Sequence, residues 1–111
     1  ETKNEKKLNY LQKQKLETQK ETFNQVIKIL LEKSIADIAK YEDLIESDND
    51  IIGLREKVVK TSESQLENGT ITATEYLTEL NNLSQAKVNL QSHKIQLAKT
   101  RVDYLTLKGN F

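Results

Sequence analysis

The chain has 111 residues with 17 basic and 17 acidic side chains, a formal net charge of zero, and no Trp, Cys, Met or Pro. Only 36% of it is hydrophobic, so an elongated structure with thin apolar seams is expected rather than a compact multilayer core. The balanced charge supplies no field for nucleic acid or an anionic membrane surface, and neither is expected as a partner. No signal peptide or bilayer-length apolar run is visible, and the start at Glu1 without Met indicates an excised piece of a longer protein.

The first two thirds of the chain predict one very long helix, from about residue 3 to 67. Residues 3 to 22 are rich in Lys, Glu, Gln and Asn, and we expect their partner to lie outside this chain. Further on, apolar residues recur every seven positions, at Leu31, Ile38, Ile45, Ile52, Val59 and Leu66. A second row with the same step widens the apolar band, with one gap at Asp37: Phe23, Leu30, Leu44, Ile51 and Val58.

The segment from Glu46 to Asp50 is the best candidate for a break in this helix, because Ser, Asp and Asn favour turns over helix interiors. A break there would produce a three-helix bundle. However, Ile45 and Ile52 keep the seven-residue step without a slip, so we favour a continuous helix. Gly53 then lies inside the helix, where it either admits a close neighbour or is tolerated at a cost of about 1 kcal/mol relative to Ala.

Residues 68 to 72 predict a tight turn. Gly69 is suited to the left-handed conformation that ends a helix, and Thr72 to Glu75 has the Thr-x-x-Glu pattern of a capping box. Ile71 before the cap and Tyr76 four residues after it have the spacing of a hydrophobic staple. A second helix is therefore expected from about residue 73 to 108, closed by Gly109.

The row of apolar residues after the turn matches the first row in reverse order. It consists of Tyr76, Leu83, Leu90, Leu97, Tyr104 and Phe111. Folding at the turn pairs Leu66 with Tyr76, Val59 with Leu83, Ile52 with Leu90, Ile45 with Leu97, Ile38 with Tyr104 and Leu31 with Phe111. The sequence thus predicts an all-α fold, an antiparallel two-helix coiled-coil hairpin. Its seam would end at Leu31, with no cover from this chain for Leu8, Leu16, Phe23 and Ile27.

The second predicted helix has a further apolar stripe that a simple hairpin does not need. Val88, Ile95 and Val102 form it, flanked by Leu77, Ala98 and Leu105. It would face about 150° away from the seam, either as scattered surface residues or, as we favour, because the helix lies between two helical neighbours. Two polar faces separate these contact faces, a basic ridge of Lys87, Lys94, Arg101 and Lys108 and a flank of Asn82, Gln85, Asn89, Ser92 and Gln96.

No catalytic, cofactor-binding or metal-binding site is expected. A two-helix seam offers little concavity, and His93 is the only histidine in a chain without cysteine, so we interpret it as a packing residue. Glu75 and Glu79 lie one helical turn apart, but acidic residues near a helix N-terminus are favoured by the helix dipole alone. We therefore expect that the chain is not an enzyme.

The stretch from Gln65 to Gly109 resembles the outer-membrane efflux protein family, the TolC-like channels, in the periplasmic hairpin of the second repeat. The matching residues are the tip Asn68-Gly69-Thr70, the helix start Thr72-x-x-Glu75-Tyr76-Leu77, the segment Leu83-x-x-Ala86-x-x-x-Leu90 and the end Tyr104-Leu105-x-x-x-Gly109. They cover about two fifths of the chain.

This resemblance implies a homotrimeric channel in a Gram-negative bacterium, whose hairpins form a periplasmic α-barrel continuous with an outer-membrane β-barrel absent from this chain. It also implies that the tip, Asn68, Gly69, Thr70 and Ile71, meets a periplasmic adaptor of a tripartite system that includes an inner-membrane pump. The family's acidic ring corresponds to Glu75, with Thr78 at its second acidic position, so these two residues are candidates for a pore constriction. Glu75 is equally explained by the capping box.

Two other classes of protein fit the same pattern. A periplasmic adaptor also projects a long helical hairpin, and a coiled-coil spacer needs nothing beyond the seam. An adaptor hairpin would be flanked by β-rich lipoyl-like halves and a channel hairpin by amphipathic β-strands, so the flanking sequence distinguishes them.

Overall fold

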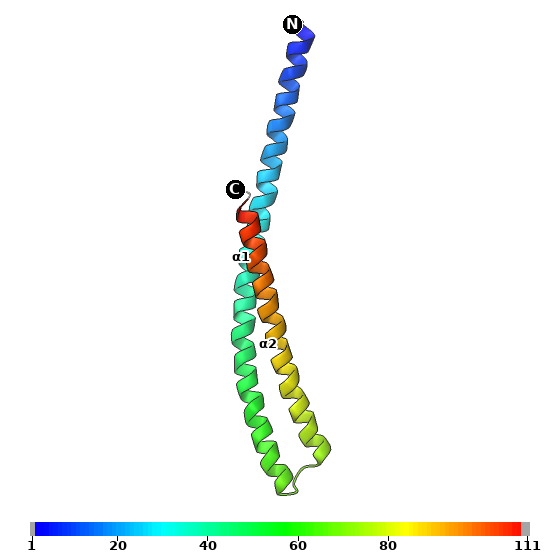
Figure 1. The fold of residues 1–111 in the computed structure, drawn as a ribbon, viewed down its shortest axis with the longest axis vertical. Helices are drawn as coiled ribbons and strands as arrows, with labels where there is room; N and C mark the ends of the chain where they lie inside the picture. The colour runs from blue at the N-terminus through cyan, green and yellow to red at the C-terminus, as the bar shows by residue number, and fades with distance from the viewer. Residues whose placement is uncertain (1, 110–111) are drawn as a thin grey trace.

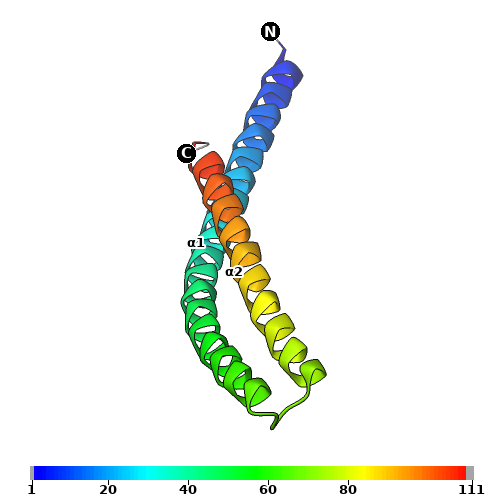
Figure 2. The ribbon, with the colours of Figure 1, turned by 60° about the horizontal axis from the view of Figure 1, so that its bottom comes forward.

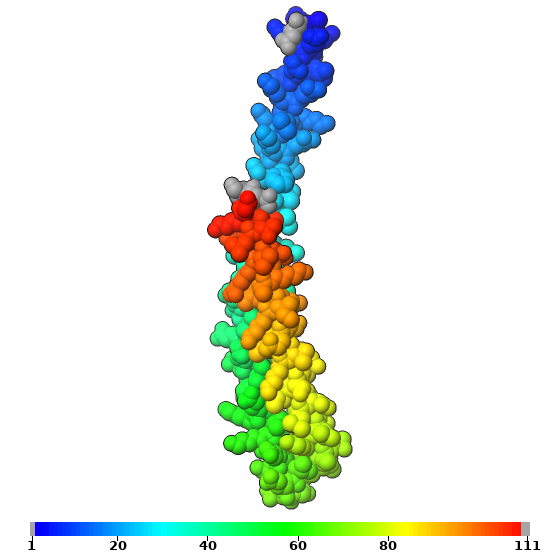
Figure 3. Space-filling model, viewed as in Figure 1, coloured from blue at the N-terminus to red at the C-terminus, as the bar shows by residue number. Residues whose placement is uncertain are grey.

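The computed structural model describes residues 2 to 109, which form two helices in an antiparallel hairpin (Figure 1). Helix α1 spans Lys3–Glu67 and α2 spans Ala73–Lys108, the bounds expected from the sequence. No strand occurs among these described residues. The molecule measures 97 × 20 × 14 Å, a narrow rod in which α1 projects beyond the end of α2 (Figure 3). The expected all-α helical hairpin is confirmed.

Helix α1 starts at a capping box formed by Thr2 and Glu5, which was not expected from the sequence. The Thr2 hydroxyl accepts a hydrogen bond from the Glu5 amide at 3.3 Å, and the Glu5 carboxylate accepts one from the Thr2 amide at 3.2 Å. These two bonds satisfy amides that have no partner within a helix's first turn. Proline is absent, so nothing in the covalent chain interrupts the helix that follows.

Helix α1 continues without a break through residues 46 to 50, as we favoured. The carboxylate of Asp48 is bonded to His93 on α2, so it does not compete for the backbone amides of its own helix. Gly53 lies in the same helix, and a Cβ placed on it would have no atom within 4 Å. It therefore admits no close neighbour and is merely tolerated.

The seam between the helices uses the expected apolar row, together with a second row that differs from the expected one. Leu90 and Leu97 are buried and their α1 partners half-buried, but Leu30, Ile51 and Val58 are exposed. The row that α2 covers instead lies three residues after the apolar row and is mostly polar: Ile27, Ser34, Tyr41, Asp48, Arg55 and Ser62. The row of Phe23, Leu30, Leu44, Ile51 and Val58, expected to widen the apolar band, is not part of the seam, because the polar row lies between it and the apolar row that α2 covers.

Two polar contacts between the helices show how they are aligned. His93 Nδ1 lies 2.5 Å from Asp48 Oδ2, and Arg101 Nη2 donates to Glu42 Oε1 at 3.3 Å. Both lie within one residue of the axial alignment that pairs Ile45 with Leu97, so they agree with the expected rungs among the described residues. The expected rung of Leu31 with Phe111 lies outside them. Figure 2 shows the two ribbons crossing in the upper half of the hairpin and separated near the tip.

The expectation that Ile27 lacks cover was wrong, since its side chain is only 7% exposed. Ile27 lies on the polar row, one heptad before Ser34. Leu8, Leu16 and Phe23 are exposed, as expected.

Candidate functional site at the hairpin tip

Residues 65 to 70 form a Schellman motif that ends α1. The Gly69 amide donates to the Leu66 carbonyl at 3.0 Å and the Thr70 amide to the Gln65 carbonyl at 2.9 Å, the two bonds that define this motif. The Thr70 hydroxyl donates to the same Gln65 carbonyl at 3.1 Å. Gly69 has φ +69°, so the expected left-handed residue is confirmed at the position where glycine has no steric cost.

Thr72 begins α2 with half of the expected capping box. Its hydroxyl accepts from the Glu75 amide at 3.1 Å, but the Glu75 carboxylate makes no return bond to the Thr72 backbone. The Glu75 side chain is exposed and is therefore not committed to the cap. The capping explanation of Glu75 is correspondingly weaker than the sequence suggested, although its charge still complements the helix dipole.

The four expected docking residues differ in how exposed their side chains are. Asn68, Gly69 and Thr70 are exposed, whereas Ile71 is half-buried beside the start of α2. Ile71 lines a hollow of about 250 Å³ between the two helix ends, together with Ser62, Gln65, Glu75, Thr78 and Glu79. The structure thus brings the two candidate constriction residues, Glu75 and Thr78, into one shallow hollow with Ile71.

The hollow has little capacity for chemistry. Thr78 uses its hydroxyl to bond the Thr74 carbonyl at 3.0 Å, and Glu79 Oε2 lies 3.9 Å from Arg55 Nη1. Residues 2 to 109 contain no group of three His, Cys, Asp or Glu side chains placed to hold a metal ion. Within the same range, neither helix is long and apolar enough to cross a membrane. The tip therefore presents polar helix ends and one partly covered isoleucine.

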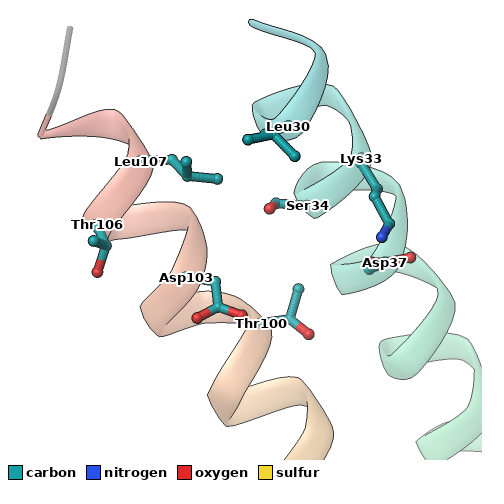
Figure 4. Close-up of a pocket in the computed structure, with 8 residues that line it drawn as sticks. All are labelled: Leu30, Lys33, Ser34, Asp37, Thr100, Asp103, Thr106 and Leu107. Atoms are coloured by element: carbon teal, nitrogen blue, oxygen red, sulfur yellow. The ribbon is translucent and has the colours of Figure 1, made fainter. Parts of the chain in front are cut away.

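A second hollow, of about 340 Å³, lies between α1 and α2 near the end of α2 (Figure 4). Leu30 and Leu107 face each other at one end of it, and Ser34 points from α1 toward α2. Lys33, Asp37 and Asp103 add charge at its rim. This hollow is open to solvent, and the residues that line it belong to the seam and its flank.

Each helix also has an apolar line that the hairpin leaves uncovered. The α2 outer stripe, which the sequence predicted, is exposed, with Ile95 at 69%; it comprises Leu77, Val88, Ile95, Val102 and Leu105. The α1 outer stripe was not recognised as separate from the seam, and it comprises Leu16, Phe23, Val26, Leu30, Ile51, Leu54 and Val58, all exposed. Leu44, half-buried, lies on the same line. Apolar residues spaced three and four positions apart, such as Phe23, Val26 and Leu30, identify this stripe in the sequence.

Comparison of the chain with protein-family models, with curated proteins and with solved structures finds no match. The resemblance to TolC-like channels therefore stays a prediction from the residues named above.

Proposed function

We propose that this hairpin is a wall segment of a passive periplasmic conduit, of the kind formed by TolC-like outer-membrane efflux or secretion channels. In this proposal the chain belongs to a longer protein that assembles as a trimer in a Gram-negative outer membrane. Its tip meets a periplasmic adaptor that links the channel to an inner-membrane pump. The chain itself carries no catalytic step.

The observation that carries this proposal is the pair of outer stripes. Each helix has one apolar line in the seam and a second line that points elsewhere, so each has two contact faces. A hairpin alone leaves these side chains in water, at a cost of about 25 cal/mol per Å² of apolar surface. Helices placed side by side in a wall cover both lines, whereas a coiled-coil spacer of two helices needs only the seam.

Self-association tests the wall arrangement. We expect the chain to associate at high concentration, and Ile95→Glu, at the centre of the α2 outer stripe, to weaken that association. Gln96→Glu is the matched control, because it adds the same charge one residue away, on the polar flank. Sedimentation equilibrium up to millimolar concentration measures both. A monomeric parent with full helicity, or equal effects of the two substitutions, would contradict the proposal.

Docking at the tip is tested in the longer protein. Asn68→Arg changes an exposed side chain and leaves the left-handed position at Gly69 intact, while Ser92→Arg places the same group on the exposed flank of α2. We expect Asn68→Arg alone to reduce drug efflux or secretion, with normal amounts of trimer in the outer membrane. Unchanged export would refute docking at this position, and loss of trimer would show that the tip acts in assembly instead.

A further inference from the structure

The apolar row of the seam does not specify which heptad of α2 faces which heptad of α1. Leu83, Leu90 and Leu97 are identical, and they face Val59, Ile52 and Ile45. If α2 moved by one heptad toward the N-terminus of α1, each leucine would meet another β-branched residue of similar size. The observed alignment must therefore be determined elsewhere in the molecule.

The polar row of the seam carries the missing information, because large and small residues alternate along it on both helices. From the Asp48–His93 contact, steps of seven place Ser34 opposite Leu107, Tyr41 opposite Thr100, Arg55 opposite Ala86 and Ser62 opposite Glu79. Two hollows support this alignment, one lined by Ser34, Thr100 and Leu107 and the other by Ser62 and Glu79. Each level of the row thus has one large and one small side chain. The large ones also reach the next level, since Tyr41 and His93 have ring centroids 6.4 Å apart and Arg55 Nη1 lies 3.9 Å from Glu79 Oε2.

Burial follows the same alternation. Ser34, Asp48, Ser62 and Ala86 are between 5% and 8% exposed, while Thr100, the small residue opposite Tyr41, is half-buried. The larger partners, such as Tyr41, Arg55 and His93, are half-buried at the seam edge. Interiors are packed closely enough that exchanging this order creates both overpacked and empty levels.

A slip by one heptad would place large side chains opposite large ones and small opposite small. Tyr41 and His93, whose ring centroids are already 6.4 Å apart, and Arg55 and Glu79, already 3.9 Å apart, would lie at the same level. Asp48 would face Ala86 and lose its partner. Asp48 is 7% exposed, and among residues 2 to 109 its carboxylate is bonded only to His93. Removing the partner of a buried carboxylate is costly, as it leaves the charge without a hydrogen bond in a poorly hydrated position.

The tip by itself does not exclude another alignment. Its Schellman bonds belong to α1 and its N-cap bond belongs to α2, so each helix end is held separately. A one-heptad slip moves α2 by about 10 Å along an axis about 8–10 Å away. The link from Glu67 to Ala73 reaches about 20 Å when extended, so it spans the slipped alignment once the Schellman bonds of Gly69 and Thr70 open.

We propose that Asp48 and His93 are positioning residues that set the axial register of α2 against α1. By doing so they set the relative height of the α1 and α2 outer stripes, and hence the surface that each hairpin offers to a neighbour. A buried polar pair in the seam is a device by which coiled coils fix register. The proposal concerns the hairpin itself and does not depend on the proposed conduit.

Moving the histidine by one heptad provides the test. In the variant Ala86→His/His93→Ala the original register places Arg55 against a large residue and leaves Asp48 unpaired. In the slipped register Asp48 regains a histidine and Tyr41 meets a small residue. We therefore expect α2 to move one heptad toward the N-terminus of α1, with helicity unchanged.

The readout is a distance between two spin labels, on cysteines introduced at the exposed positions Thr18 and Lys99 of a chain that has no cysteine. Lys99 lies level with residue 43 of α1, so the labels are separated along the axis by about 38 Å. The slip would shorten this separation by about 10 Å. Dilution with unlabelled chain removes distances between molecules, and Ala98→His, outside the seam, is the control that should leave the distance unchanged.

An unchanged distance in a fully helical Ala86→His/His93→Ala variant would overturn the proposal. If that variant loses its helicity, Asp48→Ala/His93→Ala is measured instead, because it removes both partners and leaves no unpaired carboxylate. We expect this variant to show a second population at the shorter distance, since Tyr41 then fits opposite a small residue. A single native distance would overturn the proposal here as well.

Discussion

Replacing glycine by alanine should have opposite effects at Gly53 and Gly69. Gly53 lies in the exposed interior of α1, and the added methyl group would meet no atom within 4 Å. Alanine stabilises a helix interior by about 1 kcal/mol relative to glycine, because it restricts the unfolded chain and exposes less backbone. We therefore expect Gly53→Ala to stabilise the hairpin by about 1 kcal/mol, which corresponds to a few degrees in Tm for about 100 residues.

Gly69 also has free space around its Cβ position, but its φ is +69°. A non-glycine residue in the left-handed region costs roughly 1–2 kcal/mol, because Cβ approaches the following carbonyl oxygen. Gly69→Ala should therefore destabilise the hairpin by that amount, although the substitution is chemically identical to the one at Gly53. The two variants should differ by about 2–3 kcal/mol in unfolding free energy.

Thermal and urea unfolding followed by circular dichroism measure this difference. All chains are compared at one concentration, since association stabilises the folded state by mass action. Lower stability of Gly53→Ala than of the parent would refute the open helix interior described for residue 53. Equal stability of Gly69→Ala and the parent would refute the left-handed helix end.

Three further substitutions test the cap, the seam and the surface by the same unfolding measurements. Thr72→Ala should cost about 0.5–2 kcal/mol through the lost bond to the Glu75 amide, whereas Thr78→Ala, which removes only a bond within the helix, should change little; equal effects would contradict the assigned N-cap. Leu90→Ala should cost about 2–3 kcal/mol because the side chain is buried in the seam, while Val88→Ala, on the exposed α2 outer stripe, should stay within about 0.5 kcal/mol for the monomer. Arg101→Gln breaks the exposed pair with Glu42 and should cost less than about 1 kcal/mol, so a larger loss would show that this pair also holds the seam.

The helices and the turn were predictable from the sequence because their causes are local. Seven-residue spacing places side chains on one face of a helix whatever the partner is. Gly69 and Thr72 act through backbone atoms a few residues away, so their roles also follow from neighbouring letters. The continuous helix through residues 46 to 50 was predictable from the unbroken step between Ile45 and Ile52.

The tertiary structure decided which row of α1 joins the apolar row in the seam. Two lines lie on the same side of the row that contains Ile45, a polar one through Tyr41 and Asp48 about 50° away and an apolar one through Leu44 and Ile51 about 100° away. The sequence of α1 alone favours the apolar line, because hydrophobicity is the usual sign of a contact face.

The residues of α2 determine which of these two lines is covered. The residues of α2 beside Leu90 and Leu97 are Ala86, His93 and Thr100, which complement the polar line in size and bond to it at Asp48. Such complementarity exists only between two helices in a given alignment, so neither helix reveals it separately. Heptads and the tip thus determined that this chain folds back on itself, and packing across the seam determined which faces meet and which apolar lines remain exposed.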